Sequence, residues 1–117
     1  MIFIFFYFFK SSIILNMVKL IKVVKSEKEK KKWKAIFKLD NGKEKTTHFG
    51  YYNTNDLKND YTLHKDKERR ERYRKRHAKD LKTNDPTRAG YLSYYLLWGD
   101  STSLKKNITD YKKQFDL

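Results

Sequence analysis

The spacing of apolar and polar positions in the first half of the chain predicts three β-strands. Residues 18–25 mix β-branched residues with lysine, and in residues 33–39 apolar residues alternate with lysines. Asn41-Gly42 follows and favours a two-residue hairpin turn, because both residues tolerate a positive φ. Residues 43–49 are therefore expected to return as the third strand of an antiparallel meander.

The two-residue turn also predicts a register for the second hairpin. Phe37 would face Thr46, and Ala35 would face His48. His48 would then share the inner face with Trp33 and Phe37. We interpret it as a core or core-edge histidine, because the register places no carboxylate beside it for catalysis. The turn-rich stretch that follows, residues 50–63, is expected to be a loop.

Longer apolar periods in the second half of the chain predict helices. Asp66 is the N-cap candidate of a helix that runs to about Leu81. A second helix is expected to begin at Asp85-Pro86, since aspartate favours the N-cap and proline the first helical position, and to stop at Gly99. Its apolar stripe is wide enough to predict a central helix that is covered on more than one side.

A third helix is predicted at the end of the chain, where Ser101 or Thr102 is a candidate N-cap. Its apolar face is formed by Leu104, Ile108, Tyr111 and Phe115. The predicted fold class is α+β, with an N-terminal three-stranded antiparallel meander packed with three C-terminal helices. A chain of 117 residues has the length of one domain with one modest core.

The first sixteen residues, MIFIFFYFFKSSIILN, are almost purely apolar and differ from the rest. The run is shorter than the about 20 residues that span a bilayer, contains Lys10, and lacks the basic start of a signal peptide. Phe, Ile, Lys, Asn and Tyr are encoded by codons made only of A and T, so translation from an upstream in-frame ATG in an AT-rich genome would produce such a string. We therefore interpret residues 1–16 as a misassigned start and Met17 as the true start. The alternative is a membrane anchor or signal segment, and only then is a membrane an expected partner. Residues 17–117 are predicted to form a single small basic α+β domain.

Net charge narrows the classes of partner. The chain has 28 Lys and Arg against 14 Asp and Glu, which gives a formal charge of +14. A field of that sign attracts polyanions, so we expect nucleic acid as the partner, DNA rather than RNA. The chain has no cysteine, which excludes a disulfide scaffold and thiolate chemistry and fits an intracellular protein.

Positive charge is densest in HKDKERRERYRKRHAKD, residues 64–80, which holds nine Lys or Arg. On a helical wheel these residues fall into two groups, a narrow stripe that can dock on the rest of the protein and a basic face on the other side. The docking stripe consists of Arg69, Arg70, Tyr73, His77 and Leu81. Three acids each stand four residues before a base, which predicts ion pairs along a solvated helix. The predicted pairs are Asp66 with Arg70, Glu68 with Arg72, and Glu71 with Lys75.

The charge left over on this helix predicts contacts with phosphate groups. The predicted nucleic-acid-binding residues are Arg72, Arg74, Lys75, Arg76, Lys79 and Lys82, with Lys34 and Lys38 from the sheet. The alternative is that the helix charges only meet solvent and complement the helix dipole. Tyr51 and Tyr52 lie beside the basic strands and are candidates for base stacking, the alternative being a place at the rim of the core.

No motif with a known catalytic mechanism is present, so we expect a non-enzymatic protein with no cofactor, no metal and no small-molecule substrate. A metal-dependent nuclease is a third alternative that can be drawn from His64, Asp66 and His77 with nearby glutamates. His64 and His77, however, stand at opposite ends of one helix, too far apart to share an ion without a fold-back.

Several short motifs carry a family resemblance. They are Thr47-His48-Phe49-Gly50, Asp60-Tyr61-Thr62, His64-Lys65-Asp66, Glu68-Arg69, Arg72-Tyr73, Arg76-His77, Asn84-Asp85-Pro86-Thr87, Ala89-Gly90, Leu92-Ser93, Leu97-Trp98, Ile108, Asp110-Tyr111-Lys112 and Phe115. With these motifs, residues 17–117 resemble a family of small basic proteins of unknown function encoded by nucleocytoplasmic large DNA viruses, such as mimivirus-like and phycodnavirus-like giants. The resemblance implies a viral origin and a shared compact fold, and it transfers no catalytic residue.

The sequence thus predicts a viral protein that binds nucleic acid without sequence specificity, in genome packaging or replication. We expect it inside the infected host cell, in the virus factory or the virion interior, and not secreted. The alternative is a virion structural or interaction module whose basic face meets an acidic viral protein or the inner membrane leaflet.

Overall fold

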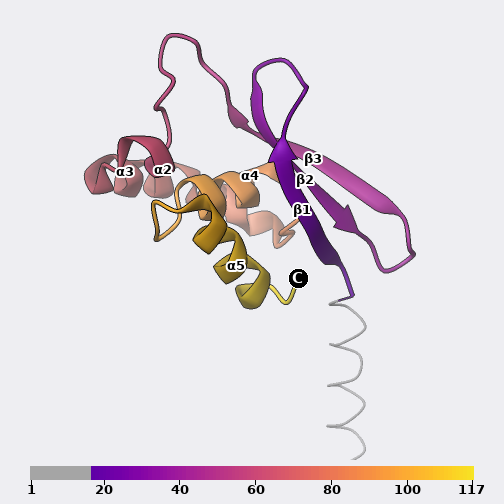
Figure 1. Ribbon diagram of the computed structural model, residues 1–117. Coiled ribbons are helices and arrows are strands. Elements are labelled where there is room, and N and C mark those ends of the chain that lie inside the picture. Colours follow the sequence, from indigo (N-terminus) through magenta and orange to yellow (C-terminus); the bar gives the residue numbers. More distant parts are fainter. Residues whose placement is uncertain (1–16) are drawn as a thin grey trace, which may run out of the picture.

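The computed structural model describes residues 17–117, so the predicted misassigned start lies outside the described residues. Three strands, β1 (Lys19–Lys25), β2 (Lys31–Lys38) and β3 (Glu44–Tyr51), form an antiparallel sheet in the order β1-β2-β3. The helical elements that follow are α2 (Tyr61–His64), α3 (Lys67–His77), the 3₁₀-helix η1 (Ala78–Thr83), α4 (Ala89–Leu92), the π-helical turn η2 (Ser93–Leu97) and α5 (Leu104–Gln114). The predicted α+β fold, a meander followed by C-terminal helices, is confirmed (Figure 1).

One face of the sheet carries the hydrophobic core. Each strand contributes to it, and the contributing residues, Leu20, Ala35, Phe37 and Phe49, are at most 2% exposed. The helical side of the core consists of Tyr61, Tyr91, Leu92, Leu96, Leu97, Trp98 and Tyr111. Most of these residues come from α4, η2 and the residue after them, which confirms that the second predicted helix is central.

The second hairpin has a different turn from the predicted one. Only Gly42 has a positive φ, of 83°, and the backbone N–H of Leu39 donates to the carbonyl oxygen of Lys43 at 2.8 Å. The loop therefore has three residues rather than two, which shifts the register by one residue. His48 lies opposite Lys34, not Ala35, and Phe37 lies opposite Lys45.

This shift overturns the prediction for His48. Because side chains alternate between the faces of a strand, a slip of one residue moves His48 to the face away from the helices and brings Phe49 into the core. There His48 Nδ1 lies 2.7 Å from the hydroxyl oxygen of Ser26. The first hairpin has its own irregularity, a bulge between Leu20 and Lys22 that leaves Ile21 exposed.

Several loops and helices begin or end at other residues than the sequence predicts. The expected loop 50–63 begins only after Tyr51 and contains the short helix α2. Asp85 does not cap a helix. It accepts hydrogen bonds from the backbone N–H and the hydroxyl of Thr87, in a turn that delays the helix until Ala89. The last helix is capped by Ser103, one or two residues later than expected.

Candidate nucleic-acid interface

The basic helix α3 begins where the sequence predicts. Asp66 is its N-cap and accepts hydrogen bonds from the backbone N–H groups of Glu68 and Arg69, at 3.0 and 3.1 Å. The bond from Arg69, followed by that from Glu68, lowers the pKa of the Asp66 carboxyl below its usual value. The α-helix ends at His77 and continues as the tighter helix η1. The predicted helix 66–81 is thus two elements in series.

Five of the predicted phosphate-binding residues form an exposed basic row on α3 and η1. They are Arg72, Lys75, Arg76, Lys79 and Lys82. Within residues 17–117 none of the five takes part in an ion pair or a side-chain hydrogen bond. Spacings of three and four residues keep them on one side of a helix. Their charges are therefore available to a partner.

Arg74, the sixth predicted residue of the helix, points inward. Its Nε donates to the carbonyl oxygen of Trp98 at 2.8 Å, and its guanidinium forms an ion pair with Asp100 at 2.9 Å. The Arg74 side chain is 20% exposed. Arg70 makes a similar contact, because its guanidinium reaches the carbonyl oxygen of Gly99 at 3.4 Å and lies over the ring of Tyr61. Two arginines of α3 thus donate hydrogen bonds to backbone carbonyl oxygens just after the central helix.

The three predicted ion pairs along the helix do not form. Instead, Glu71 contacts Arg70 and Arg74, while Arg69 pairs with Asp56 of the loop after β3. Arg70 and Arg74 also reach backbone carbonyl oxygens of the protein body, whereas Arg72 and Lys75 remain exposed. Tyr73 and Leu81 of that stripe pack against the core, as predicted.

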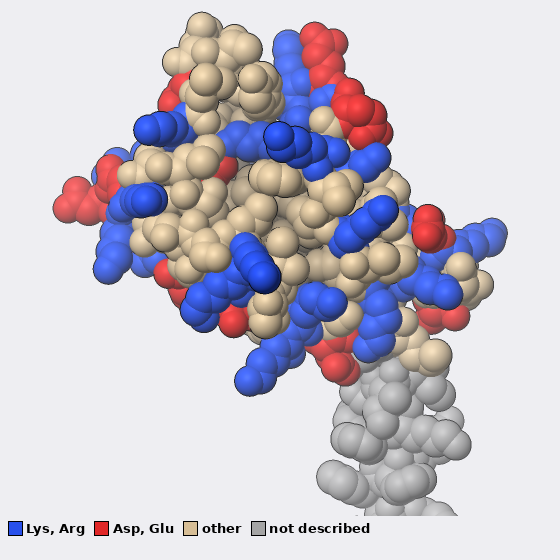
Figure 2. Space-filling model, in the orientation of Figure 1, with Lys and Arg blue, Asp and Glu red and all other residues tan. Residues whose placement is uncertain are grey.

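The two predicted residues of the sheet lie apart from this row. Lys34 and Lys38 are on the sheet face that the helices leave uncovered, since they alternate with the buried Ala35 and Phe37. Lys34 forms an ion pair with Glu27 at 2.9 Å, whereas Lys38 is exposed. Lys and Arg are spread over the face of the molecule seen in Figure 2, and are not gathered in one block. The structure therefore separates the predicted contacts into a helix row and a sheet group.

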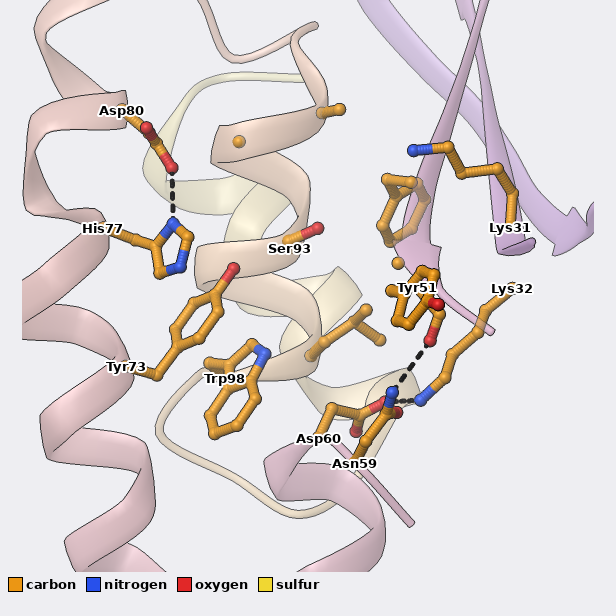
Figure 3. A pocket seen from close by; sticks show the side chains of 15 residues that line it. Lys31, Lys32, Tyr51, Asn59, Asp60, Tyr73, His77, Asp80, Ser93 and Trp98 are labelled. Atoms are coloured by element: carbon orange, nitrogen blue, oxygen red, sulfur yellow. Dashed lines mark hydrogen bonds and ion pairs between the residues drawn. The ribbon is translucent and has the colours of Figure 1, made fainter. Parts of the chain in front are cut away.

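A cavity of about 390 Å³ lies behind α3, between this helix and the ends of β2 and β3. Figure 3 shows Lys31, Lys32 and Tyr51 on its sheet side and Tyr73 and His77 on its α3 side. The sequence did not predict this cavity, because its lining comes from segments far apart along the chain.

Stacked aromatic rings form the α3 wall of the cavity. The ring of Tyr73 stacks on Trp98 and on His77, with centroids 4.1 Å apart in each pair. Burial raises the pKa of Tyr73 to about 12, so its hydroxyl stays protonated at neutral pH. The spacing of four residues between Tyr73 and His77 was the one signal for this stack in the sequence.

His77 Nδ1 lies 2.9 Å from a carboxylate oxygen of Asp80. Such a pair orients an imidazole for proton transfer when a hydroxyl nucleophile binds the other ring nitrogen. Among residues 17–117, no hydroxyl is hydrogen-bonded to His77, and no three His, Asp or Glu side chains gather closely enough to hold a metal ion. The pair links the last residue of α3 to η1.

The two candidate stacking tyrosines diverge. Tyr51 lines the cavity behind α3, whereas Tyr52 lines a second hollow between the β1–β2 loop and the loop after β3. Both are exposed, Tyr51 by 57% and Tyr52 by 49%, so neither is a core residue. Adjacent residues of one strand end thus face different sites.

Comparison with known proteins gives one match. A family model described as a family of unknown function (DUF5754) matches residues 21–77, from within β1 to the last residue of α3. The chain is similar to that family over the sheet, the loop after β3 and the basic helix. No curated protein and no solved structure matches the chain. Among the helices of residues 17–117, none is both long and apolar enough to cross a membrane.

Proposed function

We propose that this chain binds nucleic acid electrostatically and without sequence specificity, through the exposed basic row on α3 and η1. The observation that carries the proposal is that, within residues 17–117, this row forms no ion pair, while the other arginines of α3 form ion pairs or donate to backbone carbonyls. Cations that are not neutralised by neighbouring acids can replace the counterions of a phosphate backbone. A formal charge of +14 adds long-range attraction.

The length of the row suits a polyanion. At about 1.5 Å per residue in α3 and about 2.0 Å per residue in η1, the row from Arg72 to Lys82 spans roughly 17–18 Å. Duplex DNA presents one phosphate charge per about 1.7 Å of axis, so such a row meets several phosphates at once. Long flexible lysine and arginine side chains give contacts to the backbone rather than to base edges, which favours nonspecific binding. We propose genome packaging or replication as the setting, in a large DNA virus if the resemblance of residues 17–117 to small basic proteins of such viruses reflects the origin of the chain.

The test is the salt dependence of binding by the full chain to a fluorescent DNA duplex and to an RNA duplex. We expect affinity to fall steeply between about 50 and 200 mM salt, with DNA bound at least as well as RNA. Removing three cations, in the variant Arg72→Ala, Lys75→Ala and Lys79→Ala, should make the logarithmic slope shallower by roughly three.

A matched control removes the same charge from another helix. Lys105, Lys112 and Lys113 of α5 are exposed, and their replacement by alanine changes the net charge equally. This variant should retain most of the slope. No duplex binding at about 50 mM salt would contradict the proposed function. Equal slopes for the two triple variants would contradict the assignment to α3. Binding only to an acidic protein would support the alternative of a virion interaction module.

A further inference from the structure

A groove of about 470 Å³ lies between the β1–β2 loop and the loop that follows β3. Both loops leave the same end of the sheet (Figure 1). Large apolar side chains that the fold leaves exposed gather here. Tyr52, Leu57 and Leu63 are 49%, 57% and 43% exposed and line the groove together with Trp33. They are half of the exposed large hydrophobic residues in the described part of the chain, and such clusters are typical of interaction sites.

The two walls of the groove are tied to each other. The backbone N–H of Tyr52 donates to the carbonyl oxygen of Lys30 at 2.9 Å, which joins the loops directly. Lys32 forms an ion pair with Asp60, and Asp60 also caps α2, the helix that carries Leu63. A groove that is already formed loses little conformational freedom when a ligand enters.

The rim of the groove is positively charged. Lys25, Lys28 and Lys30 are exposed, and within residues 17–117 none of them forms an ion pair. Two acids also line the groove, of which Asp60 is neutralised by Lys32 and only Glu29 remains. The ligand that complements this surface is an anion with apolar, flat parts.

The geometry points to a single-stranded nucleic acid as the occupant, with unpaired bases against Trp33 and Tyr52 and phosphates at the lysine rim. Cationic grooves that contain aromatic rings bind single strands in this way, because every base has a face that stacks and every linkage has a charge. In a duplex the bases already stack on each other and do not reach such a groove. This inference rests on the proposed nucleic-acid binding and adds a second site, which prefers unpaired nucleotides.

Two neighbouring tyrosines provide a matched test. Tyr52→Ala removes a ring from the groove, whereas Tyr51→Ala removes a slightly more exposed ring outside it. The full chain is titrated with an oligothymidylate of about 15 nucleotides and with a duplex of the same length. Tyr52→Ala should weaken binding of the single strand about tenfold and leave duplex binding unchanged, and Tyr51→Ala should leave both within about twofold.

Tryptophan fluorescence gives a second readout. Trp33 and Trp98 are the two tryptophans of the chain, and Trp98 is buried. Trp33 is partly buried but lines the groove, so oligothymidylate should quench the Trp33 part of the emission in the wild-type protein. The variant Trp98→Phe isolates this signal if it folds, and the tyrosine comparison does not depend on it.

The outcomes separate the two proposals. If the duplex binds but Tyr52→Ala and Tyr51→Ala have the same effect on the single strand, or the emission does not change at saturation, the groove proposal is wrong and the α3 proposal stands. If neither nucleic acid binds, both proposals are wrong. If an alternating Glu-Leu peptide binds in a Tyr52-dependent manner and the oligothymidylate does not, the groove is a peptide site and the inference is overturned.

Discussion

Helices α3 and α5 have the same length, eleven residues, but they attach to the protein by different means. α5 buries Asn107 and Tyr111 and packs Leu104 and Ile108 against the core. α3 has no buried residue and is held by the stacked ring of Tyr73 and by arginines that donate to backbone carbonyls. An apolar stripe fixes α5, whereas one stacked ring together with directional polar contacts fixes α3. Because polar contacts need little apolar surface, α3 can expose a dense row of cations.

The largest loss of stability is expected when the apolar contacts that attach α5 are removed. Tyr111 is 1% exposed, and its hydroxyl donates to the carbonyl oxygen of Pro86 at 2.6 Å. Tyr111→Ala should lower the free energy of unfolding by about 3–5 kcal/mol, measured by urea denaturation. Tyr111→Phe keeps the ring and should cost only about 1 kcal/mol. Equal losses in the two variants would mean that the hydrogen bond, not packing, holds α5.

A smaller loss of stability is expected when the polar contacts that attach α3 are removed. Arg74→Ala removes the donor to the Trp98 carbonyl oxygen and should lower the unfolding free energy by about 1.5–3 kcal/mol. Arg76, two residues away and exposed, is the matched control, and Arg76→Ala should change stability by less than about 0.5 kcal/mol. Arg76→Ala should instead weaken duplex binding. If the stability effects were reversed, the inward and outward faces of α3 would be misassigned.

The junction between α2 and α3 is expected to respond to mild acid. His64 accepts a hydrogen bond at Nδ1 from the backbone N–H of Asp66 at 2.9 Å, and its ring packs against Trp98. Burial, reinforced by the charge of Arg69, lowers the pKa of His64 below its ordinary 6.5. The folded protein then binds fewer protons than the unfolded chain as the pH falls below 6.5. Stability should therefore decrease from that pH down to the folded-state pKa, by up to about 1.4 kcal/mol per pH unit.

The variant His64→Asn checks this pH dependence. Asparagine retains a side-chain acceptor for the Asp66 N–H but does not titrate. The urea midpoint of the variant should therefore change less with pH than that of the wild type over the same range. An identical decrease in both proteins would assign the effect to another group. No corresponding change is expected from the attachment of α5, which Tyr111 and its apolar neighbours form.

The sequence predicted the elements that depend on local signals. The alternation in residues 33–39, the N-cap at Asp66 and the apolar face of α5 each gave the correct element. The hairpin register was wrong because Asn41-Gly42 fits both a two-residue and a three-residue loop, and only the conformation of Asn41 distinguishes them. Local patterns carry no information on such a choice.

The candidate site was predicted less completely. The wheel separated the docking stripe of α3 from its basic face, but the excess of bases after Glu71 led to Arg74 being placed with the phosphate contacts, although Arg74 reaches a carbonyl 24 residues later in the chain. The groove around Trp33 and Tyr52 joins two loops that no periodicity connects. Contacts of this kind depend on tertiary packing and lie beyond pattern reasoning.

The bulge in β1 has a consequence for crowded solutions. An outer strand normally offers an unbroken series of backbone donors and acceptors to which another copy can add a strand, and this is how many sheet proteins aggregate. Between Leu20 and Lys22 the series is interrupted, and Lys19, Lys22 and Lys25 are all exposed along the same strand. A second copy would meet a mismatched ladder and three like charges. The interrupted ladder and the exposed lysines thereby protect β1 from pairing edge to edge with another copy.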